Sequence, residues 1–306
     1  MRKITINLAA VAAFCIVVAS PALVSSSCAT PQTEQEDTTI IREDLGITAL
    51  KYSSPEVPSS IEFCGKVIDL SRFDRHERMD RELLAFTYMH STSLQMLKKA
   101  NRYFPIVEPI LKENGIPDDF KYLMVIESNM NPTARSSAGA AGLWQFMQGT
   151  GRDYGLEVNN NVDERYHIEK ATRAACRYLK DAYAKYKDWV AVAASYNAGQ
   201  ARIASQLAKQ DVDDSLDLQL VEETARYVYR ILAAKQLFSA PTTFGFRLRA
   251  SDLYPPIPYT EVTVTKGIAD LARFARSKGI NLAILKNMNP VSYTHLRAHE
   301  TRGNLV

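Results

Sequence analysis

The sequence has little cysteine, little histidine and almost no excess of one charge. Its 306 residues include four cysteines and five histidines, and the cysteines lack the CxxC spacing of a structural zinc site. Cys64 and Cys176 could form a disulfide or remain two buried thiols. Lys and Arg number 37 against 34 Asp and Glu, far from the dense basic stripe of a nucleic-acid binder. We therefore expect no metal site and no nucleic-acid partner.

Long apolar runs are also scarce. The mostly apolar run at 4–18 is too short, and too closely followed by polar sequence, to predict a transmembrane helix. Arg2 and Lys3 precede the run and small residues follow it, a pattern that predicts a secretory signal peptide over 1–27. Cys28 would then be the acylated first residue of a lipoprotein, or the chain would be cleaved nearby without lipidation.

The rest of the chain divides by composition and periodicity. Residues 28–60 are polar and punctuated by proline, which predicts a tether. An all-α domain is expected over 61–240, with an N-terminal helical extension over about 61–108. A linker at 241–258 should follow. The spacing of apolar residues predicts helices over 80–89, 92–113, 120–128, 163–187, 188–197, 199–208 and 218–238.

Two features qualify this helical pattern. Pro105 and Pro109 fall inside 92–113, so that helix is expected to kink or break. After the helical domain, 244–249 and 259–264 are rich in strand-forming residues, and short helical faces follow. We therefore expect a small α+β module at 259–290.

Glu127 stands out because it continues an apolar stripe. Phe120, Leu123, Met124 and Glu127 follow the i, i+3, i+4, i+7 rule of one helix face. A carboxyl group in such a place is desolvated unless it is paired, and desolvation raises its pKa. Glycosidic bonds break when such a carboxyl protonates the leaving oxygen. The other reading is that the stripe ends one turn earlier and Glu127 faces solvent.

Several ordered motifs surround and follow Glu127. The blocks are 127–132 (ESNMNP), 136–147 (SSAGAAGLWQFM), 155–156 (GL), 163–165 (DER), 195–199 (SYNAG) and 223–228 (ETARYV). Together they closely resemble the signature of lytic murein transglycosylases with the goose-type-lysozyme-like SLT fold, in particular the membrane-bound D group. The resemblance implies an all-α lysozyme-like catalytic domain. One departure from the family pattern is Val221, which stands where proline is expected.

The resemblance also implies roles for individual residues. Glu127 would be the sole catalytic acid and then the base. Tyr196 and Asn197 would lie across the cleft, with the Tyr196 ring and hydroxyl near the catalytic carboxyl. The further implied substrate-binding residues are Ser136 and Gln145 as hydrogen-bonding groups, Gly139 and Gly142 as places where backbone approaches the sugar, and Glu223 and Tyr227 in a block of less defined role.

The implied reaction cleaves the β-1,4 bond between N-acetylmuramic acid (MurNAc) and N-acetylglucosamine (GlcNAc) in peptidoglycan. Glu127 would protonate the bridging oxygen and then take the proton of the MurNAc 6-hydroxyl, whose attack forms a 1,6-anhydro ring. The attack is intramolecular, so no second carboxylate is needed to activate water and no cofactor is implied. A monomer in the periplasm or cell envelope is expected, anchored to a membrane if Cys28 is acylated.

Two other functions remain open. A muramidase on the same fold would hydrolyse the bond with water, and Asp153 or Asp163 would then have to reach the cleft. A cell-wall-binding protein that kept the groove and lost activity is the second, although the intact Glu127 disfavours it.

Residues 259–290 resemble a degenerate lysin motif (LysM), a small peptidoglycan-binding module. The resemblance includes 259–264 (YTEVTV) and 285–290 (LKNMNP), whereas 266–269 (KGIA) replaces the usual turn of Gly-Asp-Thr-Leu type. The module could bind glycan or serve only as a structural docking element, because fold does not imply function.

Residues 291–301 resemble the translation of a transposase adaptor used in sequencing libraries. We therefore expect 291–306 to be an assembly artefact and do not read His295 and His299 as a metal pair, although they are four residues apart. Resequencing the locus from genomic DNA should return a different sequence after Pro290. Recovery of the same tail would show this expectation to be wrong.

Overall fold

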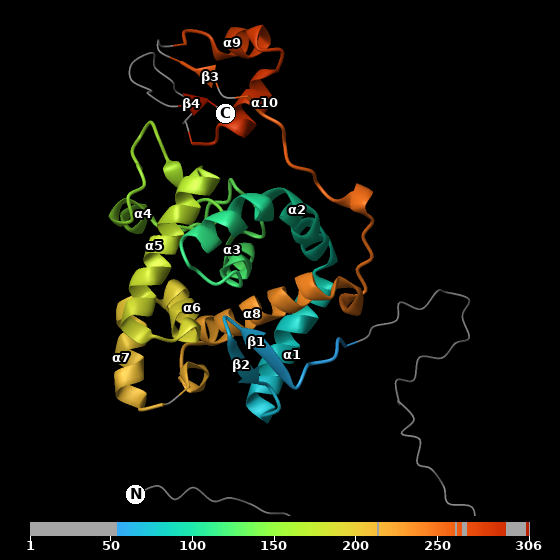
Figure 1. Cartoon of the computed structure of the whole chain (residues 1–306), viewed down its shortest axis with the longest axis vertical. Helices are drawn as coiled ribbons and strands as arrows, with labels where there is room; N and C mark the ends of the chain where they lie inside the picture. Colours follow the sequence, from blue (N-terminus) through green and yellow to red (C-terminus); the bar gives the residue numbers. More distant parts are fainter. Residues whose placement is uncertain (1–53, 213, 261, 265–267, 292–303, 306) are drawn as a thin grey trace, which may run out of the picture. The chain divides into compact units, whose positions relative to one another are not determined.

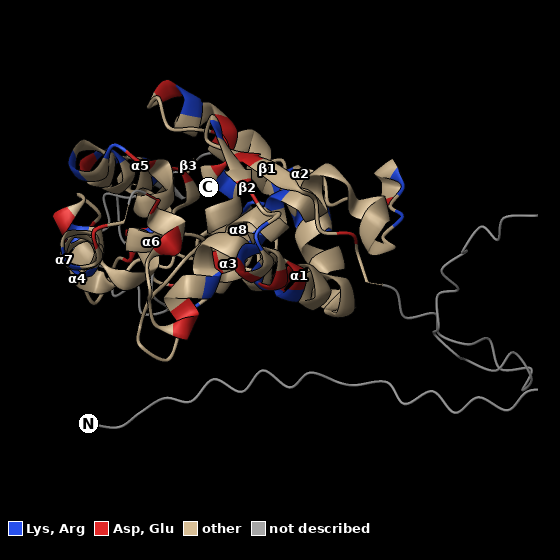
Figure 2. Cartoon of the chain, turned by 90° about the horizontal axis from the view of Figure 1, so that it is seen from below, with Lys and Arg blue, Asp and Glu red and all other residues tan. Residues whose placement is uncertain are grey.

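The computed structural model describes residues 54–212, 214–260, 262–264, 268–291 and 304–305. The predicted signal peptide, Cys28 and most of the tether lie outside these residues. Helices dominate the described chain, as predicted (Figure 1). Within the described residues, none of the helices has the length and apolar character needed to cross a membrane. Acidic and basic residues both occur along most of the ribbon, in keeping with the small net charge (Figure 2).

A β-hairpin precedes the first helix, where the sequence predicted the end of a tether and a helical extension. Strands β1 (Ser60–Phe63) and β2 (Lys66–Asp69) pair antiparallel, with Ile61 opposite Ile68. Cys64 and Gly65 form the turn with φ values of 53° and 84°, the left-handed pair that a tight hairpin needs. The expectation of a helical extension from residue 61 is therefore wrong over the hairpin. Four-residue strands are too short to show a clear period of two.

Helices α1 and α2 follow the hairpin. Helix α1 (Phe73–Tyr88) begins earlier than predicted, and α2 (His90–Glu113) includes both Pro105 and Pro109. The expected break in α2 is absent, and its ribbon follows a curve instead (Figure 1). Proline bends a helix by removing an N–H donor and crowding the preceding turn, and a bend can absorb both effects.

Helices α3 and α6 lie in the interior and carry much of the core. Helix α3 (Phe120–Ser128) contributes six buried residues, and α6 (Trp189–Ala198) buries every residue from Val190 to Ser195. A short helix that is apolar on all sides can be stable only when it is surrounded. Helix α8 (Glu222–Ser239) contacts α1, α3 and α6, so it joins α1 to both interior helices.

The remaining helices of this region follow the sequence prediction with shifted ends. Helix α5 (Ile168–Tyr186) follows a 3-10 turn, η1 (Glu164–Tyr166), and α7 (Gln200–Gln210) follows α6. A second turn, η2 (Ser215–Asp217), precedes α8 (Glu222–Ser239). Val221 has φ −61° and ψ 148°, the backbone that a proline would adopt, so its departure from the family pattern leaves the helix start intact. The short helix α4 (Gln148–Asp153) had no sequence signal.

Residues 241–256 pack on the helices instead of forming a free linker. The 3-10 turns η3 (Pro241–Phe244) and η4 (Ala250–Asp252) replace the strand predicted at 244–249. Phe244 and Phe246 are buried, and the Tyr254 N–H donates to the Lys98 carbonyl of α2 at 3.0 Å. The apolar residues that alternate at 244–248 therefore belong to an irregular segment that contacts the core. The period of apolar residues alone cannot distinguish such a segment from a strand.

The C-terminal region has the predicted α+β composition. Strand β3 (Val262–Thr263) pairs antiparallel with β4 (Asn304–Leu305), and α9 (Leu271–Ser277) and α10 (Leu282–Met288) follow β3 in sequence. Asp270 and Asn281 cap the two helices by accepting from backbone N–H groups. Strand β4 lies within 291–306, the residues expected to be an assembly artefact.

A fully buried ion pair holds the irregular loop between α3 and α4. Asp163 and Arg165 have no exposed side-chain surface, and their oxygen and nitrogen lie 2.7 Å apart. The Arg165 guanidinium also donates to the carbonyls of Gly139 and Phe146, each at 2.8 Å. A buried charge needs such partners because burial removes its hydration. One cation therefore fixes two distant points of the loop.

Replacing Asp163 by alanine should destabilise the protein by about 3–5 kcal/mol, because the Arg165 charge would lose its buried counter-ion. Unfolding in urea measures this change. The matched control is Glu113→Ala, which breaks an exposed pair with Arg173 and should cost less than about 1 kcal/mol. Equal costs for the two variants would contradict the role given to the buried pair.

Candidate active site

Glu127 lies at the carboxyl end of α3, on the stripe that the sequence predicted. Phe120, Leu123 and Met124 are completely buried, whereas Glu127 is half-buried and reaches the edge of the core. The helix ends one residue later, because Asn129 and Met130 take left-handed backbone conformations with φ 49° and 58°. Such a conformation is unusual for a buried methionine, and strain of this kind concentrates at functional sites.

Burial is the main influence on the protonation of Glu127. It raises the pKa of Glu127 from 4.5 to about 7. The Tyr227 hydroxyl, which donates a hydrogen bond to the Glu127 Oε1, and the Arg230 charge both lower this pKa, whereas the Glu223 charge raises it. The carboxyl therefore holds a proton up to neutral pH and can also release it, as a group acting first as acid and then as base requires.

Two tyrosines approach Glu127, and they differ in the group to which each donates a hydrogen bond. Tyr227, in α8, is buried and donates to the carboxyl. Tyr196, in α6, donates its hydroxyl hydrogen to the Trp144 carbonyl at 2.8 Å instead. Glu127 raises the pKa of both tyrosines, although burial has the larger effect, so both lie within its electrostatic reach. The hydroxyl bonded to the carboxyl is thus that of Tyr227, for which the resemblance gave no defined role.

The implied substrate-binding loop is ordered mainly by its own hydrogen bonds. Ser136 is exposed, and its Oγ accepts from the Ala140 N–H at 3.0 Å. Gln145 has φ 48°, and its side-chain nitrogen donates to the carbonyls of Ala134 and Gly142 at 3.2 and 2.8 Å. The two side chains are therefore held in place by the loop.

The two glycines of this loop differ in their surroundings. A Cβ atom at Gly142 would meet the carbonyl oxygen of Arg165 at 1.9 Å, whereas a Cβ atom at Gly139 would meet nothing within 4 Å. Both have the positive φ that favours glycine. Gly142 is therefore needed for close packing against the buried ion pair. Of these two glycines, Gly139 is the one with room for a ligand to approach the backbone.

The last two implied residues lie on α6 and α8. The Asn197 Oδ1 accepts from the Thr224 hydroxyl at 2.9 Å, which ties the end of α6 to the first turn of α8. Glu223 is exposed and acts on Glu127 through its charge. The structure thus brings Tyr196, Tyr227 and Glu223 into the electrostatic surroundings of Glu127.

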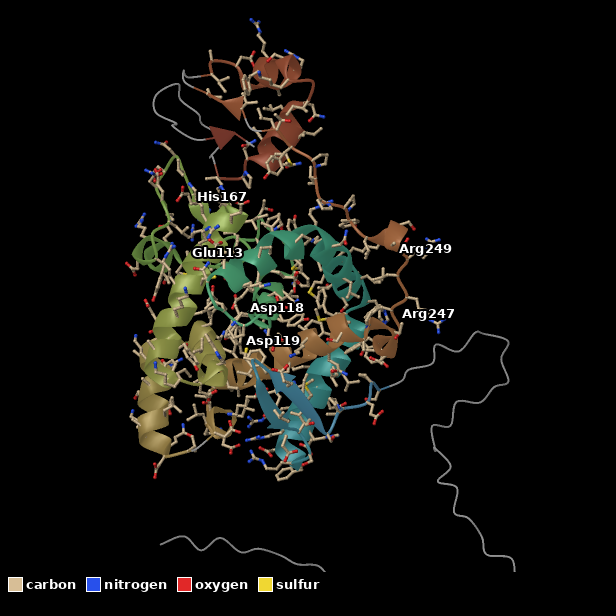
Figure 3. All side chains as sticks on the ribbon, viewed as in Figure 1. Glu113, Asp118, Asp119, His167, Arg247 and Arg249 are labelled. Carbon is tan, nitrogen blue, oxygen red and sulfur yellow. The ribbon has the colours of Figure 1, made fainter. Side chains whose placement is uncertain are left out.

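Sequence reasoning missed the groups that brace α3 from outside the motifs. Asp119, at the start of α3 (Figure 3), has a carboxylate that accepts from the Cys64 N–H at 2.7 Å and from Lys235 at 2.9 Å. It therefore links α3 to the hairpin turn and to α8. Arg230 was also missed. A lone arginine on a helix carries no sequence signal that would distinguish it from a solvated one.

The carboxylates proposed for a muramidase lie in unequal places. Asp163 is enclosed in the buried pair with Arg165, so its oxygens cannot activate a water in an open cleft. Asp153 is exposed on α4.

Cys64 is half-buried and Cys176 buried, and both are free thiols, so the disulfide alternative is absent. Within the described residues, no group of His, Cys, Asp and Glu could hold a metal ion.

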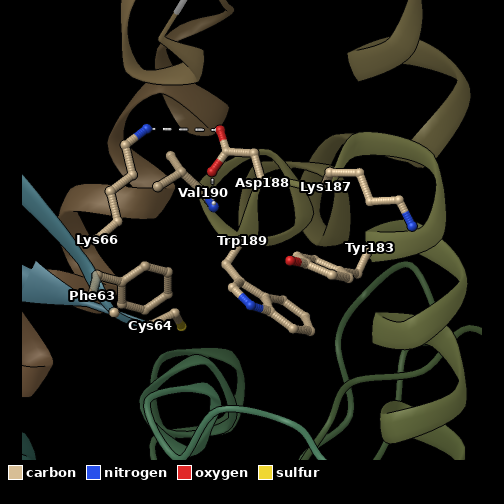
Figure 4. Close-up of a pocket in the computed structure, with 9 residues that line it drawn as sticks. Phe63, Cys64, Lys66, Tyr183, Lys187, Asp188, Trp189 and Val190 are labelled. Carbon is tan, nitrogen blue, oxygen red and sulfur yellow. Dashed lines mark hydrogen bonds and ion pairs between the residues drawn. The ribbon is translucent and has the colours of Figure 1, made fainter.

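A separate pocket lies where the hairpin turn faces the junction of α5 and α6 (Figure 4). The rings of Tyr183 and Trp189 stack there with centroids 4.0 Å apart, and Lys66 pairs with Asp188 at 3.9 Å. These contacts already engage the aromatic faces and charges of the pocket. It contains none of the residues implied to bind substrate, so the site around Glu127 is the better candidate for chemistry.

Comparison with known families defines the class of protein. Residues 105–217 match the transglycosylase SLT domain, and residues 260–299 match the LysM-like domain found at the C-terminus of soluble lytic transglycosylases. The chain therefore has a lysozyme-like SLT domain followed by a LysM-like domain. The second match continues nine residues beyond Pro290, into the stretch that resembles adaptor sequence.

The chain is homologous to membrane-bound lytic murein transglycosylase D of Escherichia coli K12, with 28% identity over 218 residues, which are 70% of this chain and 47% of that protein. Membrane-bound lytic murein transglycosylase C of Haemophilus ducreyi is 29% identical over 150 residues, covering 44% and 40%. The crystal structure of the 70-kDa soluble lytic transglycosylase Slt70 of Escherichia coli has a TM-score of 0.42, with 18% identity over 58% of this chain and 33% of that one. This chain thus spans about half the length, or less, of these relatives.

Replacing Glu127 by glutamine should change how stability depends on pH. The native pKa of about 7 exceeds the ordinary 4.5, so the native state binds more protons between these values and stability falls as the pH rises through them. The variant lacks this loss. Above pH 7 its free energy of unfolding should exceed that of the parent by about 1–2 kcal/mol, after allowance for partial exposure.

Urea unfolding at pH 4, 6 and 8 measures the difference between Glu127→Gln and the parent. The exposed Glu113→Gln is the matched control and should follow the parent at each pH. A constant difference between Glu127→Gln and the parent across this range would show that Glu127 is not held protonated by burial.

Proposed function

We propose that this chain is a peptidoglycan lytic transglycosylase that cleaves the MurNAc–GlcNAc β-1,4 bond and leaves 1,6-anhydro-MurNAc ends. The observation that carries the proposal is the half-buried Glu127, with a pKa near 7, bonded to the Tyr227 hydroxyl inside a transglycosylase SLT domain. Several of its relatives are named as murein or peptidoglycan transglycosylases, which supports the same reaction class.

The first step is transfer of the Glu127 proton to the bridging oxygen as the bond to the MurNAc anomeric carbon breaks. The acetamido group of the same sugar stabilises the developing positive charge. The Tyr227 hydroxyl then donates to a carboxylate instead of a carboxylic acid, and a hydrogen bond to the ionised form is the stronger of the two. Tyr227 thus limits the cost of leaving a negative charge at a partly buried position.

In the second step Glu127 accepts the proton of the MurNAc 6-hydroxyl as this oxygen attacks the anomeric carbon. Both reacting groups belong to one sugar, so the attack has a high effective concentration and needs no activated water. Ser136, Gln145 and Asn197 hold the sugars by hydrogen bonds, and backbone approaches them at Gly139. The fixed geometry of the Gln145 loop supports this role, because a preorganised site loses little entropy on binding.

Hydrolysis by water is the competing reaction. It would need a second carboxylate on the opposite face of the sugar, and the enclosure of Asp163 removes one candidate. Glu223 is the carboxylate whose charge reaches Glu127, so it becomes the residue to replace if reducing ends carrying added water are found.

We also propose the cellular setting. The signal-like residues 1–27 and the membrane-bound relatives support a place in the periplasm or cell envelope, with Cys28 as the point of lipid attachment. The LysM-like module would add affinity for glycan strands, and the protein would act as a monomer.

Mass spectrometry of fragments released from purified peptidoglycan tests the reaction. The protein should release 1,6-anhydro-MurNAc products, Glu127→Gln should lower the rate at least 10²-fold, and Glu113→Gln should not change it. The rate should fall as the pH rises through about 7, because the acid must start protonated. Reducing muramic ends would identify a muramidase, and binding to sacculi without release would identify a wall-binding protein.

A further inference from the structure

Glu82, in α1, is a buried carboxylate that the proposed reaction does not use. Its residue surface is 1% exposed. One carboxylate oxygen accepts from the Arg226 Nε at 2.5 Å, and the other lies 3.6 Å from the Arg230 Nε. Both arginines belong to α8 and lie one turn apart, so a single carboxylate engages two successive turns of that helix.

Arg230, which is partly exposed, connects the buried Glu82 to the candidate active site. It is the cation that favours the ionised form of Glu127, and it is also an ion-pair partner of Glu82. Arg230 therefore pairs with Glu82 on α1 and acts on Glu127 on α3 through its charge. Tyr227, between Arg226 and Arg230 in sequence, is the residue whose hydroxyl is bonded to Glu127.

We propose that Glu82 is a positioning residue for the catalytic acid: it holds α8 through Arg226 and neutralises Arg230, and so keeps Arg230 from stabilising the Glu127 anion. This inference rests on the proposed function. Under this proposal a residue of α1, outside the matched SLT segment, helps to keep Glu127 protonated. Glu82 touches no reacting atom and acts only through α8.

Electrostatics supports this route. An opposite charge within about 4–6 Å favours the charged form of a carboxyl group, and the effect weakens when the cation has a second anionic partner. The groups that face Glu127 are Tyr196 on α6 and Tyr227, Arg230 and Glu223 on α8. The Glu223 charge raises the pKa of Glu127, whereas the Arg230 charge lowers it. Glu82 weakens the effect of Arg230 by pairing with its guanidinium.

A purely structural role predicts a different outcome. Replacing both members of a buried ion pair often leaves stability little changed, because desolvation offsets the attraction. Removing one member leaves the other charge without its counter-ion and lowers stability. A role in stability alone would lower the free energy of unfolding of Glu82→Gln without moving the titration of Glu127. The titration is therefore the decisive measurement.

The experiment follows the Glu127 carboxyl carbon by NMR in protein labelled with ¹³C-glutamate, assigned by its loss in Glu127→Gln. Glu82→Gln should lower the pKa of Glu127 by about 0.5, and Arg230→Gln should raise it by a similar amount. Adding Glu82→Gln to Arg230→Gln should cause no further change, because the path from Glu82 runs through Arg230.

The matched control is Glu222→Gln, which removes one carboxylate from an exposed pair with Arg81 between the same two helices. It should leave the titration of Glu127 unchanged. An unchanged titration in Glu82→Gln, or the same shift with and without Arg230, would overturn the proposal. If Glu82→Gln does not fold, Arg230→Gln still tests the proposal. An unchanged pKa of Glu127 in that variant would by itself overturn the proposal.

The same variants separate this inference from the proposed function. In the pH dependence of 1,6-anhydro product release, the alkaline limb should move to lower pH in Glu82→Gln and to higher pH in Arg230→Gln. No product from any of the proteins, together with the expected titration shifts, would reject the reaction and retain the link between Glu82 and Glu127.

Discussion

The structure depends on keeping one carboxyl group largely out of water without a full counter-charge. A close ion pair would make Glu127 a permanent anion, and full exposure would return its pKa to the ordinary range. The protein uses an intermediate arrangement, in which burial is opposed by a tyrosine hydroxyl and by a shared arginine. Such a balance requires α3 and α8 to stay in fixed register, and the ionic brace between Asp119 and Lys235 joins these helices.

A second constraint concerns the loop that follows the acid. Its backbone is irregular, with left-handed residues at Asn129, Met130 and Gln145, and its own hydrogen bonds form only isolated bridges and turns. Arg165 adds to this order by bonding two loop carbonyls from within the core. The cost of burying this cation is offset by Asp163. The same pair explains why Asp163 is unsuited to activating water.

Local sequence patterns predicted most of the helices, because apolar period and helix breakers act over a few residues. The place of Glu127 on the apolar stripe also predicted its partial burial, and the resemblance predicted the SLT and LysM-like domains. The hairpin was missed because its strands are short, and the packed segment at 241–256 was missed because its contacts are remote in sequence. The choice between Tyr196 and Tyr227 as the hydroxyl bonded to Glu127 depends on how α6 and α8 pack, which no local pattern contains.

The groups that surround Glu127 extend beyond the segment that carries it. Glu127 and the loop that follows it belong to the matched residues 105–217, whereas Tyr227 and Arg230 follow that segment on α8 and Glu82, the partner of Arg230, precedes it on α1. A fragment limited to the matched residues would lack the tyrosine bond and the shared arginine, and its interior helices would lose the cover of α8. The matched SLT segment therefore contains the proposed acid, and the flanking helices supply the groups that surround its carboxyl.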